Sequence, residues 1–149
     1  MASFEIDFPE DLMSDLLETE FEEIAKEALA EAAPILEKAT KDSASTVIMH
    51  EGDSEMVASI KAGKPKRTKT DAWILNVGPT GNSKHHYYRK GGRKERAYPV
   101  SNKLKAIWKE YGIPGRQAPR PFLEHAKNAV QNVIIKKIQE VYDRKVGAK

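Results

Sequence analysis

The sequence predicts an α+β domain in which a long N-terminal helix, a short helix and a long C-terminal helix pack on one face of a small antiparallel sheet. Two stretches with apolar residues at every third or fourth position flank a central stretch in which apolar residues alternate. The chain has 149 residues, which fits one domain over 1–149 with a core that needs neither metal nor disulfide. Because it contains no cysteine, disulfides, thiolate zinc sites and cysteine nucleophiles are excluded.

The first helix is expected to begin near Asp7, since Asp7 precedes Glu10 by three residues as in a capping box. Apolar residues then recur at helical spacing to about Lys41, and glutamates occupy much of the remaining surface. Pro34 interrupts this pattern, because an interior proline removes a hydrogen bond and clashes with the preceding turn. The sequence therefore predicts either a kink near Ala30 or two helices in series.

The central part of the chain predicts two strands joined by a basic turn. Residues 55–60 are expected to form a helical turn that leads into the first strand, and residues 73–77 alternate as a strand with one buried face does. The lysine-rich residues 63–69 form the expected hairpin connection. The short apolar piece 47–49 is compatible with either a strand or a buried turn. Residues 82–99, which are basic and lack an apolar repeat, are predicted to be a mobile loop.

The last third of the chain predicts two helices joined by a proline-containing connector. Ser101 can cap a short helix, which ends at Gly112 because glycine accepts the left-handed conformation. Pro119 and Pro121 hold the connector extended, and Pro121 suits a first helical turn because it has no N–H to satisfy. The last helix then carries one apolar face, which we expect to be buried and which is formed by Phe122, Leu123, Ala126, Val130, Val133, Ile134, Ile138, Val141 and Tyr142.

Charge divides the chain into an acidic and a basic part. Residues 1–60 contain sixteen Asp/Glu against three Lys, a net charge of −13, whereas residues 61–149 contain twenty-two Lys/Arg against six Asp/Glu, a net charge of +16. This asymmetry suits head-to-tail packing of identical copies, pairing of the two parts inside one monomer, or nucleic-acid contact through the basic part. The candidate oligomer interface combines acidic residues of the first helix with basic residues of the predicted loop: Glu22, Glu23, Glu27, Arg89, Arg93 and Arg96.

No constellation typical of catalysis, cofactor binding or metal binding is found in the sequence, so we expect neither an enzyme nor a cofactor. Residues 78–84 resemble a phosphate-binding loop only superficially, because their lysine follows the serine. His85 and His86 lack the spaced partners of a metal site. The acidic start is not typical of a signal peptide, and no apolar stretch approaches the length of about 18 residues that is read as a candidate membrane helix, so no membrane partner is expected.

An alternative function is a basic nucleic-acid-binding module. Single-stranded nucleic acids are bound by cations that contact phosphates and by aromatic rings that stack on bases. The basic turn and the stretch 89–96 offer the cations, and two adjacent tyrosines offer the rings. The candidate contact residues of this alternative are Lys64, Lys66, Arg67, Lys69, Tyr87 and Tyr88.

Several motifs, taken in order, resemble the minor tail component family of long-tailed bacteriophages. Residues 59–61 with the following turn resemble the family's first strand and hairpin, and residues 77–79 resemble the end of its second strand. The segment 105–112 is similar to the family's helix that ends in an acidic-aromatic-glycine triplet, here Glu110-Tyr111-Gly112. Arg120-Pro121-Phe122-Leu123 is similar to the most recognisable signature of the family, at the start of its last helix.

The resemblance covers roughly residues 10–145, and two departures accompany it. The insertion 82–99 is longer and more basic than the family needs, and His125-Ala126 stands where a proline-alanine pair is commoner. The resemblance implies a virion structural protein of the neck, made in the cytoplasm of the host bacterium, that completes the tail or joins it to the head. It also implies a homo-oligomeric ring, partners among neck, connector or tail-tube proteins, and proximity to DNA.

Overall fold

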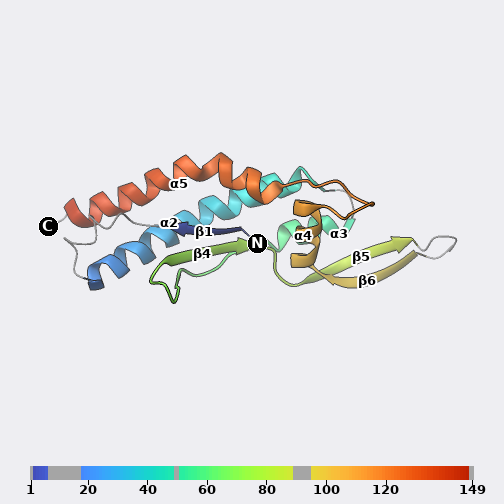
Figure 1. Cartoon of the computed structure of the whole chain (residues 1–149), viewed down its shortest axis with the longest axis horizontal. Coiled ribbons are helices and arrows are strands. Elements are labelled where there is room, and N and C mark those ends of the chain that lie inside the picture. The colour runs from blue at the N-terminus through green and yellow to red at the C-terminus, as the bar shows by residue number, and fades with distance from the viewer. Residues whose placement is uncertain (1, 7–17, 49–50, 89–94, 148–149) are drawn as a thin grey trace.

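The computed structural model describes residues 2–6, 18–48, 51–88 and 95–147 and confirms the predicted α+β class (Figure 1). Its elements in chain order are β1 (Ala2–Ile6), α2 (Glu18–Ser45), α3 (Glu51–Ala58), β2 (Lys61–Ala62), β3 (Lys66–Arg67), β4 (Trp73–Gly78), β5 (Asn82–Tyr88), β6 (Glu95–Ser101), α4 (Asn102–Tyr111) and α5 (Phe122–Gly147). The two long helices α2 and α5 lie side by side along the molecule, and β4 packs against α2.

The hydrophobic core lies between the two long helices and one face of the sheet. Its buried residues come chiefly from α2, β4 and α5, and they include Ala25, Leu29, Ala32, Leu36, Trp73, Leu75, Val77, Phe122, Leu123 and Ile134. The apolar face predicted for the last helix is confirmed with one exception, since Val133 is 51% exposed. Burying this face of α5 against α2 removes apolar surface from water, which is the main favourable term in folding.

The structure decides one of the two specific predictions made for the first long helix. The structure keeps α2 as one helix that contains Pro34, so the alternative of two helices in series is wrong. The expected start near Asp7 lies outside the described residues. Ahead of α2 the structure adds β1, a strand that the sequence did not predict.

β4 is the central strand of the larger sheet. β1 pairs antiparallel with one of its edges, with Phe4 opposite Leu75, and β2 and β3 pair with the other. The predicted connection over residues 63–69 is only partly correct, because Lys66 and Arg67 within it form β3. The turn into β4 comes after β3, where the N–H of Asp71 donates to the carbonyl of Thr68. Alternation along β4 buries Trp73, Leu75 and Val77 and leaves Asn76 exposed, so the sheet packs on the helices through one face.

The prediction of a loop over residues 82–99 is wrong. Residues 82–88 and 95–101 form the antiparallel pair β5 and β6, with Asn82 opposite Ser101 and Tyr88 opposite Glu95. This two-stranded sheet projects from the body of the molecule (Figure 1). A search for alternating apolar residues does not detect such a ribbon, because alternation arises only where one face of a strand is buried.

The apolar piece after α2 is a turn and not a strand. The N–H of Val47 donates to the carbonyl of Ala44, and the Val47 side chain packs against the core. Met49 lies outside the described residues. The expected helical turn before the first strand is present as the longer helix α3, which ends at Ala58 just ahead of β2.

Candidate interaction site

Two motifs that are ten residues apart in the sequence meet at the start of α5. The Glu110 carboxylate accepts hydrogen bonds from the backbone N–H of Leu123 through Oε2 at 2.9 Å and from that of Glu124 through Oε1 at 3.2 Å. The first N–H groups of a helix have no partner inside the helix and carry partial positive charge, so a carboxylate is well suited to cap them. Glu110 is therefore the cap of α5, supplied by the last turn of α4.

Gly112 ends α4 and turns the connector back over it. Its φ of 76° and ψ of −179° lie in a region that is essentially restricted to glycine. A Cβ at this position would stand 2.6 Å from the carbonyl oxygen of Gln117 and 2.8 Å from the nitrogen of Pro119. The N–H of Arg120 then donates to the carbonyl of Lys109 at 2.6 Å. This return of the chain brings Pro121 to the position just before the first residue of α5, as its motif predicts.

Helix α4 is inverted, because its polar side is buried and its apolar side is exposed. Its buried residues are Asn102, Lys105, Ala106, Lys109 and Glu110. Leu104, Ile107 and Tyr111, at spacings of three and four, share the opposite side and are 40%, 39% and 71% exposed. We call these three residues the α4 face. The sequence predicted this helix from the same apolar residues, but it gave no signal that they face outward.

The buried side of α4 holds an ion pair with α3. Nζ of Lys109 lies 2.7 Å from Oδ2 of Asp53, and the two side chains are 4% and 3% exposed. Among the described residues no acceptor lies at a hydrogen-bonding angle to this Nζ. We therefore treat the contact as an ionic one without a well-aligned hydrogen bond. Because both side chains are buried, water does not screen the attraction between their charges.

A second buried amine, that of Lys105, holds the base of β5. Its Nζ donates to Oγ of Ser83 at 2.6 Å and to the carbonyl of Lys84 at 2.7 Å. Burial lowers the pKa of Lys105, and the attraction of Asp53 and Glu55 acts in the opposite direction. The sequence missed this role, because a lysine between apolar residues of a short helix has the ordinary pattern of a solvated one.

Asn102 completes the attachment of the projecting sheet to α4. Its Oδ1 accepts a hydrogen bond from Oγ of Ser83, and its Nδ2 donates to the carbonyl of Thr80 at 2.8 Å. Its backbone N–H donates to the carbonyl of Gly81 at 2.9 Å. The expected cap by Ser101 is wrong, since the Ser101 side chain makes no capping hydrogen bond. The base of β5 is thus fixed to α4 through buried polar contacts.

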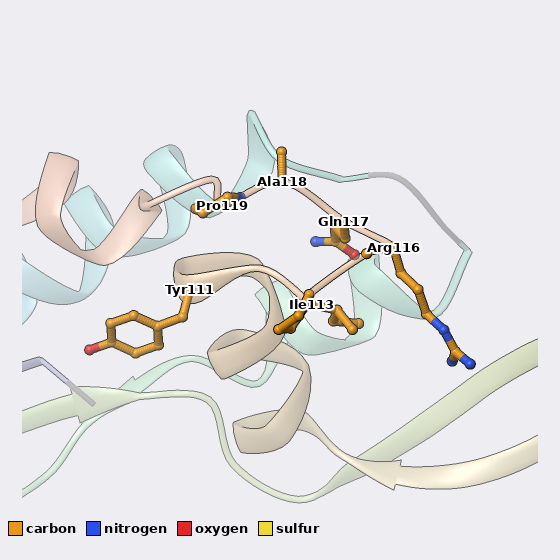
Figure 2. A pocket seen from close by; sticks show the side chains of 8 residues that line it. Tyr111, Ile113, Arg116, Gln117, Ala118 and Pro119 are labelled. Carbon is orange, nitrogen blue, oxygen red and sulfur yellow. The ribbon is translucent and has the colours of Figure 1, made fainter.

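A hollow with a volume of about 480 Å³ adjoins the end of the α4 face (Figure 2). It is lined by Tyr111 and by the connector residues 113–119. The connector is closed on itself, because Ile113 and Gln117 exchange backbone hydrogen bonds of 2.9 Å. The side chains of Tyr111 and Arg116 extend in opposite directions, away from each other (Figure 2).

The acidic residues of the predicted interface are largely engaged inside the chain. Glu22 pairs with Arg67, and Glu27 pairs with Arg144 at 2.6 Å and with Lys145 at 2.7 Å. For these two glutamates the structure supports the alternative in which the acidic and basic parts pair within one monomer. Glu23 is exposed. Of the basic partners, Arg89 and Arg93 lie outside the described residues, and Arg96 stands in β6 opposite Tyr87.

The pairs between α2 and α5 predict a loss of stability in acid. The hydrogen bond from Lys145 lowers the pKa of Glu27, and the hydrogen bond from Arg144 lowers that of Glu31. A carboxyl whose pKa is lowered by folding stabilises the folded state at pH values above its ordinary pKa, and this contribution disappears as the pH falls through the lowered value. We expect E27Q/E31Q to reduce the slope of unfolding free energy against pH below the ordinary carboxyl pKa of 4.5.

Urea unfolding at a series of pH values measures this slope. The control is Glu23→Gln, on the same helix but with an exposed side chain, which should leave the slope as it is in the wild type. An unchanged slope in E27Q/E31Q would show that the contacts with Arg144 and Lys145 contribute nothing to acid sensitivity.

The candidate nucleic-acid contacts lie on two separate sheets. Lys64, Lys66 and Lys69 are exposed around β3, whereas Tyr87 and Tyr88 belong to β5 of the projecting sheet (Figure 1). The fourth cation, Arg67, is paired with Glu22 and with Asp71. The structure therefore places the cations and the tyrosines of this candidate on different sheets.

Comparison with known proteins finds no matching family model, curated protein or solved structure. The resemblance to the minor tail component family therefore depends on the motifs alone. In the part of the chain that the structure describes, no group of three or more His, Asp or Glu residues is placed to hold a metal ion. None of the helices within the described ranges is long and apolar enough to cross a bilayer.

Proposed function

We propose that this protein is a structural subunit of a tailed bacteriophage virion, which completes the tail or joins it to the head by assembling into a ring. The motif resemblance supplies this function. It is supported by the way the two most specific motifs form one joint: Glu110 of the triplet caps the helix that Arg120-Pro121-Phe122-Leu123 opens. The spacing between the two motifs lets the Glu110 carboxylate reach the first N–H groups of α5. This contact gives a physical reason for the two motifs to occur together.

The inverted helix α4 is the observation that favours assembly most directly. Burying a large apolar side chain contributes about 1.5–3 kcal/mol, and removing an amine from water opposes folding. α4 exposes Leu104, Ile107 and Tyr111 and buries Lys105 and Lys109, which is the reverse of what favours an isolated monomer. A partner that covers the α4 face would make this arrangement favourable.

The projecting sheet also suits a subunit that reaches a neighbour. A two-stranded hairpin is marginally stable in water by itself, and unpaired strand edges favour pairing with another chain. Among the described residues β5 and β6 pair only with each other. Their base is nevertheless fixed by buried contacts to Lys105 and Asn102, so the sheet is held in one direction relative to the body.

Sedimentation velocity on nucleic-acid-free protein over a range of concentrations tests this proposal. We expect one discrete oligomer whose mass is a fixed multiple of 16.7 kDa and does not grow further with concentration, because a ring closes. A monomer at every concentration would contradict self-assembly. A series of ever larger species would contradict closure.

A further inference from the structure

We infer that neighbouring subunits pair through the edges of the projecting sheet, with the outer edge of β5 in one copy against the outer edge of β6 in the next. This inference rests on the proposed ring and names one contact within it. The groups that make the contact are backbone N–H and C=O groups, so its occupant is an extended strand. A second copy of this chain supplies a strand whose open and closed positions match.

The backbone groups that face outward from this sheet follow from the phase of its ladder. In an antiparallel pair, hydrogen-bonded residue pairs alternate with pairs whose N–H and C=O groups point away from the partner strand. The N–H of Asn102 donates to the carbonyl of Gly81 at 2.9 Å, so the next hydrogen-bonded pair is Ser83 with Val100. The outward groups therefore belong to residues 82, 84, 86 and 88 of β5 and to residues 95, 97, 99 and 101 of β6.

Close to the body of the molecule, both edges of the sheet are closed. The outward carbonyl of Lys84 accepts the 2.7 Å hydrogen bond from Nζ of Lys105, and α3 packs against β5. In β6 the residue opposite Lys84 is Pro99, which has no N–H to donate. Proline is one of the residues that protect a strand edge from further pairing. A regular ladder can therefore not be extended on either side at this level of the sheet.

Farther from the body, both edges are open. The outward residues there are His86 and Tyr88 in β5 and Glu95 and Ala97 in β6. None of them is proline, so each can donate one backbone hydrogen bond and accept another. Within the described ranges, β5 and β6 pair with no third strand, and Figure 1 shows this part of the sheet clear of the helices. Because His86 lies opposite Ala97, the two open stretches stand at the same level on opposite edges.

A second copy placed beside the first at the same level brings these unlike edges together. β5 of one copy then runs antiparallel to β6 of its neighbour, because the two strands of each sheet are antiparallel. His86 faces Ala97 of the neighbouring copy, and such a pair can exchange both backbone hydrogen bonds. In the same register Lys84, whose carbonyl is already engaged, faces Pro99 of the neighbouring copy, which has no N–H that needs that carbonyl. The closed positions of the two edges thus match as well as the open ones.

A second copy fits these edges better than a nucleic acid does. The phosphates of a nucleic acid offer acceptors alone, so the outward carbonyls of β5 and β6 would stay unpaired, whereas a strand brings both donors and acceptors. Pairing of β5 with β6 also joins unlike surfaces. Repeated contacts between unlike surfaces close into a ring when the rotation permits, whereas pairing of two like edges ends at a dimer.

Cysteine pairs test the contact, because the chain contains no cysteine of its own. Chains with His86→Cys and chains with Ala97→Cys are co-expressed, purified and oxidised, and a non-reducing gel detects disulfide-linked dimers. We expect a dimer, since the Cα atoms of a hydrogen-bonded pair are about 5.5 Å apart, a separation that a disulfide spans. Either variant alone should give none. The matched control is Y88C with A97C, which is two residues out of register and should give no more dimer than either variant alone.

A proline substitution tests the same contact without oxidation. Ala97→Pro removes an outward N–H and leaves the bonds between β5 and β6 in place, as Pro99 already does two residues away in the same strand. We expect the concentration at which half of the protein is assembled to rise by about tenfold or more, because a backbone hydrogen bond is lost and the opposite carbonyl is left unpaired. Ala97→Val keeps the N–H and should assemble as the wild type does. Circular dichroism confirms that both variants are folded.

The outcomes separate this contact from the proposed function. A closed oligomer in which H86C with A97C forms no disulfide, or in which H86C alone is crosslinked, would overturn the pairing of unlike edges while leaving the ring intact. An A97P variant that assembles as readily as A97V would overturn it in the same way. A wild-type protein that is monomeric at every concentration would instead overturn the proposed function, so the two failures are distinguishable.

Discussion

Asp53→Ala is expected to lower the unfolding free energy by about 3–5 kcal/mol, because it leaves the buried amine of Lys109 without its counter-charge. Removing one member of a buried ion pair is costly, since the remaining charge keeps its desolvation penalty and loses the attraction that offset it. Urea unfolding followed by circular dichroism measures the change. A protein of this size has a total stability of roughly 5–15 kcal/mol, so D53A should be close to the limit of folding.

Two further variants distinguish the loss of the ion pair from a general sensitivity of α3 to substitution. D53L/K109M replaces both charges with apolar side chains, and we expect it to recover most of the stability lost in D53A. Glu55→Ala, which alters an exposed residue of the same helix, should change the unfolding free energy by no more than about 0.5 kcal/mol. If D53A and E55A had the same small effect, the buried pair would not stabilise the joint between α3 and α4.

Gly112→Ala is expected to destabilise the protein by about 3 kcal/mol or more. A backbone conformation that is essentially restricted to glycine costs an alanine about 1–3 kcal/mol, and the added Cβ would meet backbone atoms at 2.6 Å and 2.8 Å that cannot rotate away. Overlap inside a packed joint adds a further cost of about 1–3 kcal/mol. The unfolding free energy of the purified variant in urea gives the number directly.

Gly115 provides the matched control, because it has a similar φ of 71° and no atom within 4 Å of the position of a Cβ. Gly115→Ala should therefore show only the conformational part, about 1 kcal/mol. Equal effects at the two glycines would mean that the close return of the connector over α4 contributes nothing beyond backbone conformation.

The parts of the fold that the sequence predicted are those whose signals are local. The apolar stripe of α5, the alternation along β4 and the glycine at the end of α4 each follow from spacing or from the conformational freedom of a single residue. The same local logic correctly associated Pro121 with the start of the last helix.

The parts that the sequence missed depend on contacts between distant segments. α4 has an ordinary amphipathic pattern, and only its packing shows that Lys105 and Lys109 are inside while Tyr111 is outside. Those amines are buried because Asp53 and Ser83 come from other elements to meet them. Likewise, no local signal says that Glu27 pairs with Arg144, which is more than a hundred residues away.

Contacts between distant segments also determine the position of the α4 face. Glu110 and Gly112 fix the joint between α4 and α5, and Asp53 and Ser83 hold the polar side of α4 inward. The apolar side of α4 is consequently presented on a rigid support, next to a hollow. A rigid, pre-formed surface of this kind loses little conformational entropy when a partner covers it.

Electron microscopy of the purified wild-type protein, at a concentration where it sediments as an oligomer, tests the central claim most directly. We expect closed rings with rotational symmetry, in which each subunit touches its two neighbours through unlike surfaces. Two-fold dimers, open filaments or single monomers would contradict a ring-forming structural subunit.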